Sequence, residues 1–334
     1  MDSRADIRVD THTLQLSNLA KLYFPREGIS KGDLLAYYDA IAEHLLPHAQ
    51  RRPLTLERAP DGIDGVHFLE KQIPRGTPAW IHRISLSALE GRKRVTYALC
   101  DDRATLLYFV NLGTIAFHGW VSHTGDLGSP DFAIFDLDPG EECSLATLAR
   151  VALTVRANLE RIGLSALVKT SGATGLHVLA PLAGARSYGT VKTLTYEIAR
   201  GVLSERPKDV TLERSLRERD RRAVYLDYRQ VGRGKTIVLP YSARLRDGAP
   251  VSTPLHWHEV EEFAAMRIRG RPAATFARFN IASVRGRIRH YGDLWKHFAR
   301  EARQIAPALE ALPPARRLAH GKGIASYESV AVPK

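Results

Sequence analysis

The stretch FAIFDLDPG (residues 132–140) decides how the rest of the sequence is interpreted. It has the apolar composition of a buried strand, but it ends in two carboxylates, Asp136 and Asp138, followed by Pro-Gly. Side chains alternate between the two faces of a strand, so both carboxylates project to one side and Leu137 projects to the other. Carboxylates are rarely buried without a partner, and this strand end therefore requires a cation.

A cation between adjacent carboxylates is most simply Mg²⁺ or Mn²⁺, because these ions prefer oxygen ligands. Two such ions side by side are used in phosphoryl transfer. A D-x-D pair also arises by chance, so the pair alone does not establish a catalytic site. Phosphatases with an aspartate nucleophile carry Thr or Val two residues after the second Asp, where this chain has Gly140. We exclude that class.

Two further segments favour a catalytic interpretation. The segment AVYLDYRQ places Asp227 inside a second apolar strand. The segment KTSGATGLHVLAP contains a turn whose amides can converge on phosphate oxygens, formed by Ser171, Gly172 and Gly175. His177 follows on the emerging strand. Taken singly, an ordinary hairpin explains the turn, and a core histidine bonded to a backbone carbonyl explains His177.

Positive charge accompanies these motifs. The segment QVGRGKTIVLPYSARLRDG supplies Arg233, Lys235 and Arg244 close to Asp227 in sequence. A nucleoside triphosphate carries about four negative charges and needs such cations besides the metal, although a solvated basic loop also explains each residue singly.

The 334-residue chain has Lys+Arg 48 against Asp+Glu 36, a formal net charge of +12. This excess favours a polyanionic partner such as nucleic acid, although an Arg-rich proteome would produce the same bias.

Strand-like and helix-like segments alternate, which predicts an α/β or α+β core. The expected strands are RVTYALC, FAIFDLD, SALVKTSG, LHVLAPL, VYLDY and TIVLPYS. Helices are expected over residues 31–47, which begin with a capping box, and over 188–204. A third helix starts at Ser144 and stops at Gly163. The segment DRATLLYFVNLGTIAFHGWVS is expected to form one further, buried helix.

Composition also limits the setting of the protein. Two cysteines cannot build a disulfide framework or a Cys-rich zinc site. The start, MDSRADIRVD, lacks the apolar core of a secretory signal, and no run approaches the roughly 18 apolar residues of a membrane span. We therefore expect a cytoplasmic protein without membrane contact. The Ala-, Pro-, Arg- and Lys-rich end, residues 301–334, is expected to be a basic and partly flexible extension.

Together these motifs resemble the polymerase domain of bacterial DNA ligase D, a primase-polymerase of the archaeo-eukaryotic primase superfamily that acts in non-homologous end joining. The resemblance covers residues 16–297 and rests on KLYFPREGISKGDLLAYY, RRPLTLERAPDGIDG, NLGTIAFHGW, FDLDPG, TSGATGLHV, YLDY and RGKTIVLPYSARLRDGAPVSTPL. It implies an α/β (α+β) fold in one compact unit. A primase-like catalytic module with an RRM-like antiparallel or mixed sheet would span residues 126–300, and an N-terminal αβ module would span 1–125.

The resemblance also implies a role for each matching residue. Two Mn²⁺ or Mg²⁺ ions would be held by Asp136, Asp138 and Asp227. The residues that match or flank nucleotide-binding positions are Ser171, Gly172, His177, His118, Arg244, Arg233 and Lys235. A 5′-phosphate at the far side of a DNA gap would be bound by Lys21 and Lys31. The template strand would stack on Phe68.

Four positions depart from the usual family pattern. Thr174 and Glu57 stand where Lys is usual, Leu69 stands where a second aromatic is usual, and Val231 replaces Asn. The metal ligands are unchanged, so we expect retained catalysis. The departures leave open the nucleotide affinity, the choice between NTP and dNTP, and the hold on the template.

The implied activity is a nucleotidyltransferase that extends a primer at a gap or break, with Ku and a DNA ligase as partners. The alternative is a non-catalytic module that binds DNA ends. No Lys-x-Asp-Gly nucleotidylation motif of a ligase occurs in the sequence. The chain is therefore expected to be a stand-alone polymerase or an excised domain, and its start favours the former.

Overall fold

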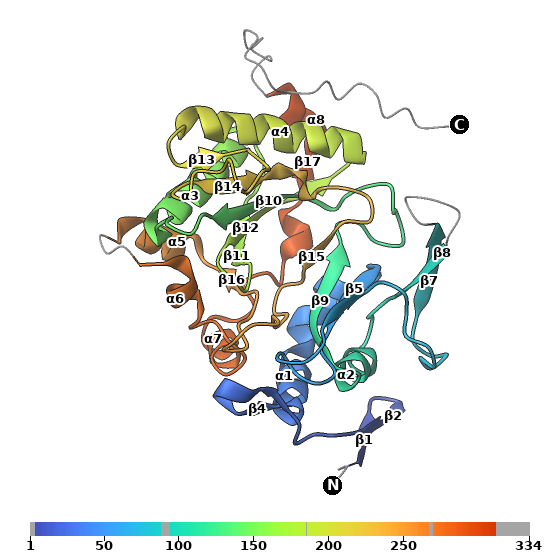
Figure 1. Cartoon of the computed structure of the whole chain (residues 1–334). Coiled ribbons are helices and arrows are strands. Elements are labelled where there is room, and N and C mark those ends of the chain that lie inside the picture. The colour runs from blue at the N-terminus through green and yellow to red at the C-terminus, as the bar shows by residue number, and fades with distance from the viewer. Residues whose placement is uncertain (1–3, 88–93, 185, 267–269, 312–334) are drawn as a thin grey trace.

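Two β-sheets form the framework of the computed structural model, which describes residues 4–87, 94–184, 186–266 and 270–311 (Figure 1). The larger sheet has the strand order β13-β14-β10-β12-β11-β16, with β17 paired to β12. Its strands are β10 (Phe132–Pro139), β11 (Leu167–Thr170), β12 (Leu176–Ala183), β13 (Val210–Thr211), β14 (Val224–Asp227), β16 (Pro254–Leu255) and β17 (Arg303–Gln304). The β13–β14 and β12–β17 pairs are parallel and the others antiparallel. The expected mixed sheet is confirmed.

Three helices lie along the larger sheet: α3 (Leu145–Arg161), α4 (Tyr188–Glu205) and α5 (Trp257–Ala265). Helix α3 contacts β10, β12 and both other helices, and α4 also contacts β10. Ser144 caps α3 by accepting a hydrogen bond from the amide of Thr147 at 3.0 Å. The helix ends before Gly163, which has the left-handed φ of 78°. The sequence-based expectations for α3 and α4 are confirmed.

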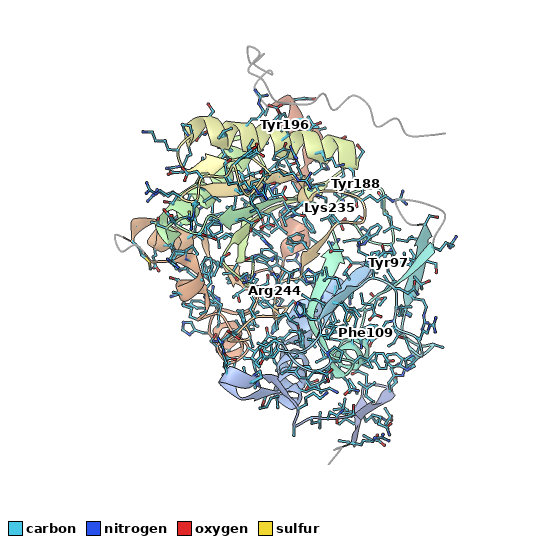
Figure 2. The ribbon with its side chains drawn as sticks, in the orientation of Figure 1. Tyr97, Phe109, Tyr188, Tyr196, Lys235 and Arg244 are labelled. Atoms are coloured by element: carbon cyan, nitrogen blue, oxygen red, sulfur yellow. The ribbon has the colours of Figure 1, made fainter. Side chains whose placement is uncertain are left out.

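The smaller sheet has the order β15-β9-β5-β6 and packs with two helices. Its strands are β5 (Leu54–Arg58), β6 (Phe68–Glu70), β9 (Thr114–Trp120) and β15 (Thr236–Val238), and its helices are α1 (Lys31–Ala49) and α2 (Arg103–Asn111). The expected capping box opens α1 through Ser30 and Asp33. Phe109 of α2 is fully buried (Figure 2). Strand β15 follows β14 in the chain but pairs with β9, so it joins the two sheets.

One expected element is wrong. The segment of residues 102–122 is not a single helix: α2 ends at Asn111 and the chain continues as β9 from Thr114. Gly113 makes the break. Its φ is 89°, and a Cβ at this position would lie 2.7 Å from the Cα of Pro60. The apolar residues after Gly113 therefore leave the helix and pair with β5.

The remaining elements are short. The small two-stranded sheets are β1 (Ala5–Val9) with β2 (His12–Leu16), β3 (Leu22–Phe24) with β4 (Ile29–Ser30), and β7 (Arg83–Ser87) with β8 (Arg94–Ala98). The short helices are η1 (Pro25–Glu27), η2 (Tyr228–Gln230), α6 (Pro272–Phe276), α7 (Val284–Tyr291), η3 (Phe298–Glu301) and α8 (Ile305–Glu310).

The end of the chain is described only in part. Ile305 and Ala308 of α8 are buried. The expected flexible end falls mostly on residues 312–334, which lie outside the described residues. Within the described ranges, the helices are too short or too polar to cross a lipid bilayer.

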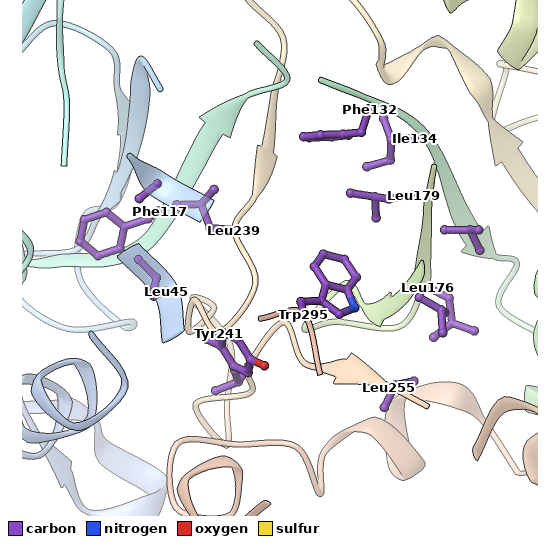
Figure 3. Packing of buried hydrophobic residues seen from close by; sticks show 14 of the residues in the cluster. Leu45, Phe117, Phe132, Ile134, Leu176, Leu179, Leu239, Tyr241, Leu255 and Trp295 are labelled. Carbon is purple, nitrogen blue, oxygen red and sulfur yellow. The ribbon is translucent and has the colours of Figure 1, made fainter. Parts of the chain in front are cut away.

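Buried side chains fill the space between the two sheets (Figure 3). Those from the larger sheet include Phe132, Ile134 and Leu179, and Trp295 lies beside them. Phe132 and Ile134 share a face of β10 with Asp136 and Asp138, because alternate residues of a strand point the same way. This face of β10 is therefore apolar where the strand begins and acidic where it ends.

Candidate active site

The three predicted carboxylates meet at the end of two neighbouring strands. Asp136 on β10 is the register partner of Asp227 on β14, and Asp138 is the partner of Tyr225. Leu137 is fully buried on the opposite face of β10. The structure therefore brings together, on one face of the sheet, the two parts of the acidic site that the sequence separates.

The electrostatics of the acidic pair fit a divalent cation. Burial and the neighbouring charges of Asp136 and Asp227 raise the pKa of Asp138 to about 7. Burial alone would raise the pKa of Asp136, but His177 and then Lys169 outweigh it, so that pKa lies below its usual range. The buried Oδ1 of Asp136 lies 3.2 Å from Nε2 of His177 and has no other hydrogen-bond donor as a partner. A buried carboxylate with one such contact, beside a carboxyl group whose pKa is raised, is the arrangement that an oxygen-seeking cation stabilises.

The carboxylate of Asp227 is engaged within its own turn. Its Oδ1 accepts a hydrogen bond from the amide of Arg229 at 2.8 Å, and its Oδ2 accepts one from Nε2 of Gln230 at 3.1 Å. Asp227 thus caps the short helix η2. Among the described residues, no three His, Cys, Asp or Glu side chains form a ready-made metal cage. Asp227 would join a shared metal site by turning toward Asp136 or by sharing its oxygens.

His177 is held on both sides by side chains. Its ring is 3% exposed; Nδ1 lies 2.8 Å from Nζ of Lys169, and Nε2 lies 3.2 Å from Oδ1 of Asp136. Burial and then the Lys169 charge lower the pKa of His177 to about 4. A contact between His177 and a nucleotide would therefore require one of these two contacts to open.

Lys169 is a site residue that the sequence reasoning missed. It is 1% exposed, and its Nζ also donates to Oγ of Ser252 at 2.5 Å. Burial lowers its pKa well below the usual value, and the charge of Arg244 contributes. A signal was available: the turn after Thr170 makes Lys169 the register partner of His177 in the hairpin of β11 and β12. A polar residue in register with a candidate histidine lies on the same face of the sheet and therefore belongs to the same site.

The turn between β11 and β12 is braced by Arg244. Its Nη1 donates to the carbonyl of Ser171 at 2.8 Å, and its Nε is buried without a hydrogen-bond partner. Ser171 Oγ accepts from the amides of Ala173 and Gly175 at 3.2 and 3.1 Å. Gly172 has φ 72°, and a Cβ there would lie 2.6 Å from Cγ of Arg244. Two turn amides thus already have an acceptor, and they reach a phosphate only when Ser171 turns away.

Glu57 and His118 form a pair on the smaller sheet. Nε2 of His118 lies 3.1 Å from Oε2 of Glu57. The hydrogen bond from His118 lowers the pKa of Glu57, and the charge of Arg244 also contributes. Burial lowers the pKa of His118. The unusual acid at position 57 therefore has a defined partner and a cation near it.

Arg233 and Lys235 are exposed and lie on the segment between η2 and β15. Nζ of Lys235 donates to the carbonyl of Arg229 at 2.6 Å, beside the turn that Asp227 caps. In Figure 2, Lys235 lies near α4, apart from Arg244. Arg233 and Lys235 thus share one segment, and Arg244 lies apart from Lys235. Of the other two departures close to this site, Thr174 lies on the turn and Val231 is fully buried.

A second candidate site lies near the N-terminus of α1. Lys21 and Lys31 line one pocket of about 230 Å³, together with Ser17, Asn18, Tyr23, Pro60, Asp61, Asn111 and Leu112. Nζ of Lys21 is 2.7 Å from Oδ1 of Asp61, and Lys31 donates to the carbonyl of Ser17 at 2.6 Å. The structure therefore brings the two predicted lysines together, with Asp61 as a partner of one of them.

Phe68 lies on β6, the edge strand of the smaller sheet. It is 41% exposed, and its neighbours Leu69 and Val66 are more exposed still. The guanidinium of Arg58 lies 5.5 Å from the centre of the Phe68 ring. An exposed ring beside a cation is a surface on which a nucleic-acid base can stack.

Known proteins are similar to this chain in sequence and in fold. Residues 30–295 match the family model described as LigD, primase-polymerase domain. The chain is 33% identical over 285 residues to the multifunctional non-homologous end joining protein LigD of Mycolicibacterium smegmatis, covering 84% of this chain and 35% of that protein. It is 30% identical over 280 residues to the bifunctional LigD of Bacillus subtilis, covering 84% and 43%. The chain therefore spans less than half the length of these relatives.

A solved structure gives the same result. The polymerase domain of Mycobacterium tuberculosis ligase D in complex with DNA superposes with a TM-score of 0.76 at 31% identity, covering 87% of this chain and 99% of that one. The family resemblance predicted from the motifs is confirmed: this chain belongs to the family of LigD primase-polymerase domains.

Proposed function

We propose that this nucleotidyltransferase domain extends a DNA primer 3′ end with NTPs or dNTPs at gaps or breaks that carry a 5′-phosphate. The observation that carries the proposal is the acidic strand end, where Asp136, Asp138 and Asp227 lie on one face of β10 and β14. The relatives are named as non-homologous end joining proteins. We extend that setting to this chain, in the cytoplasm at the nucleoid, with Ku and a DNA ligase as partners.

The three carboxylates would hold two Mn²⁺ or Mg²⁺ ions. When bound, such ions lower the pKa of the attacking hydroxyl and neutralise charge on the triphosphate. Asp227 borders the end of the sheet and would accept the proton of the primer hydroxyl when a side chain takes part. The triphosphate would be positioned by the turn of Ser171 and Gly172 and by Arg244, and His118, Arg233 and Lys235 would border it.

The DNA would be held by the N-terminal module, residues 1–125, while residues 126–300 carry the chemistry. Lys21 and Lys31 would bind the 5′-phosphate in the pocket of about 230 Å³ that they line. Phe68 would stack on a template base. The basic extension, residues 301–334, would add non-specific attraction to DNA.

The alternative, a non-catalytic module that binds DNA ends, is less well supported. It accounts for the departures at Thr174 and Leu69. It does not account for the raised pKa of Asp138 beside two other carboxylates, because burying such a group costs free energy that a bound cation would offset. The family to which the chain belongs also favours catalysis.

The decisive assay measures incorporation of labelled ATP and dATP on a 5′-phosphorylated gapped duplex, with Mn²⁺ and Mg²⁺ compared. Asp136→Ala should abolish extension and leave DNA binding largely intact. Glu141→Ala removes a carboxylate from the exposed loop after β10 and should leave extension unchanged. Extension that persists in Asp136→Ala contradicts the metal assignment. Extension that is absent from the unaltered protein with either metal favours the end-binding module.

A further inference from the structure

A row of polar residues crosses the larger sheet. Lys169 on β11 is the register partner of His177 on β12, His177 is the partner of Asp136 on β10, and Asp136 is the partner of Asp227 on β14. The row places a buried amine, an imidazole and two carboxylates side by side on four strands. Asp136 and Asp227 are proposed metal ligands, whereas Lys169 is separated from them in the row by His177.

Burying Lys169 at its position costs free energy. It is 1% exposed, and among the described residues no carboxylate lies within ion-pair distance of its Nζ. Burying an amine without an acidic partner costs free energy unless its hydrogen bonds are satisfied. A residue that packs without this cost, such as Met, would fill the same space. The function of Lys169 is therefore expected to depend on its hydrogen bonds.

The hydrogen bonds around Nζ define its direction of donation. The single hydroxyl proton of Ser252 is used toward the carbonyl of Thr170 at 3.0 Å. Ser252 Oγ must therefore accept from Nζ of Lys169 at 2.5 Å. An ammonium has further N–H donors and no lone pair. The second contact, to Nδ1 of His177 at 2.8 Å, then requires that Nδ1 be the unprotonated ring nitrogen.

The contact at Nε2 of His177 favours the same tautomer. Nε2 of His177 faces Oδ1 of Asp136 at 3.2 Å. An ionised carboxylate is only an acceptor, so an Nε2 lone pair would face it unfavourably and an Nε2–H group faces it favourably. A neutral Lys169 amine has N–H groups for both acceptors but also a lone pair that could accept from Nδ1–H. The Asp136 carboxylate therefore selects the Nε2–H tautomer in either case, and a Lys169 ammonium selects it at Nδ1 as well.

We propose that Lys169 is a positioning residue: its hydrogen bond to Nδ1 holds His177 as the Nε2–H tautomer, which directs an N–H group at the Asp136 carboxylate and keeps that carboxylate oriented for a divalent cation. The link to the cation rests on the proposed function. Partners of metal ligands, one bond removed from the metal, commonly change metal affinity by about 10- to 100-fold.

The first test needs no variant. Histidine labelled with ¹⁵N in the metal-free protein gives long-range ¹H–¹⁵N correlations that distinguish the two tautomers, and the His177 signals are identified by their loss in His177→Gln. The expected pattern is a neutral ring with the proton on Nε2. A ring with the proton on Nδ1, or an even mixture of the two tautomers, overturns the proposal.

The second test removes the donor. In Lys169→Met only the Asp136 carboxylate still selects the tautomer, so the Nδ1–H form should become detectable, and Mn²⁺ affinity measured without DNA or nucleotide should fall about 10- to 100-fold. Lys208→Met is the control, because it makes the same side-chain change at an exposed lysine after α4, outside this row. It should leave the tautomer and the Mn²⁺ affinity unchanged. Unchanged Mn²⁺ affinity in a folded Lys169→Met overturns the proposal.

These readouts separate the inference from the proposed function. The tautomer of the metal-free protein does not depend on any polymerase activity. A protein with the Nε2–H tautomer and Lys169-dependent Mn²⁺ binding that fails to extend any primer would disprove the polymerase assignment and leave the role of Lys169 standing. Full primer extension together with an Nδ1–H ring would support the polymerase assignment and disprove the role of Lys169.

Discussion

Asp136 on β10 and Asp227 on β14 lie directly opposite each other, yet their carboxylates are engaged differently. Both oxygens of Asp227 accept hydrogen bonds from η2, whereas the buried Oδ1 of Asp136 faces only Nε2 of His177, at 3.2 Å. Asp136 is therefore the carboxylate with fewer hydrogen bonds before a cation binds. Asp227 has a structural role besides its proposed catalytic one, and the two roles can be separated by substitution.

Asp227→Asn should lose activity and keep the fold. The amide oxygen still accepts from the amide of Arg229, so we expect the free energy of unfolding to change by less than about 1 kcal/mol. Metal-dependent primer extension should fall at least about 100-fold, because one ligand charge is lost. Single-turnover extension and thermal unfolding measure the two effects. Asp227→Ala loses the cap as well and should be about 1 kcal/mol less stable than Asp227→Asn. Wild-type extension by Asp227→Asn would show that this residue is not a metal ligand.

The pocket of Lys21 and Lys31 predicts an effect on the DNA end. Nζ of Lys21 is paired with the exposed Asp61, which competes with a phosphate for the same cation. Lys21→Met should reduce the preference for 5′-phosphorylated over 5′-hydroxyl gapped DNA by about 10- to 150-fold, since a charge-assisted hydrogen bond is worth about 1.5–3 kcal/mol. Binding titrations with the two duplexes at one salt concentration measure this preference.

The competing carboxylate predicts the opposite effect. Asp61→Asn should raise the affinity for the 5′-phosphorylated duplex by up to about fivefold, because an exposed ion pair is worth at most about 1 kcal/mol. Asp64→Asn makes the same charge change in the same loop outside the pocket, and it should change the affinity less than twofold. Equal gains in both variants would mean that net charge, not the release of Lys21, causes the effect.

The sequence predicted the acidic site better than it predicted the topology. Strand alternation was enough to place Asp136 and Asp138 on one face, because that rule is local. The end of α2 was not predictable, since it depends on the close approach of Gly113 to Pro60, far away in sequence. The pairing of β15 with β9 also rests on a three-residue strand and a distant partner. Local periodicity carries no information about such contacts.

The roles of individual polar side chains were only partly accessible. Motifs drew attention to His177, but not to Lys169, which determines the hydrogen bonding of its ring. An apolar strand that contains one lysine suggests a buried strand whose lysine lies at a solvent-exposed end. The buried location of that lysine follows from β16 and Ser252, which approach from later in the chain.

Glu57 is expected to weaken nucleotide binding. Its carboxylate is held by His118 and lies in the field of Arg244. Glu57→Gln keeps an acceptor for His118 and removes one negative charge. At an effective dielectric constant of about 20, a charge about 10 Å from a phosphate contributes about 1–2 kcal/mol, so the KM for ATP should fall about 5- to 30-fold with kcat unchanged. Steady-state extension kinetics measure both constants.

The control for this variant is Glu70→Gln, which removes a carboxylate of the same sheet that pairs with Arg58. It should leave the KM for ATP within about twofold. If Glu57→Gln also leaves this KM unchanged, the acid at position 57 does not act on the nucleotide.

His48 should make the stability of the fold depend on pH. Its Nε2 is buried without a hydrogen-bond partner, and its ring packs against Trp295 and Phe298. Burial lowers its pKa from 6.5 to about 4, so the folded state favours the neutral ring. Above pH 6.5 both states are neutral and His48 has no effect. As the pH falls from 6.5 toward 4, only the unfolded state takes up the proton, and the free energy of unfolding decreases by up to about 3 kcal/mol.

Chemical unfolding of wild type and His48→Phe between pH 5 and 8 measures this contribution. Phe fills the aromatic site and cannot take up a proton, so the variant should lack the His48 part of the stability loss. The stability difference between the two proteins should therefore shift in favour of the variant as the pH falls below about 6.5, by about 1.4 kcal/mol per pH unit at most. Carboxylates that protonate in the same range affect both proteins equally and cancel in the difference. A difference that stays constant from pH 8 to 5 would mean that His48 takes up its proton as readily in the folded state as in the unfolded one.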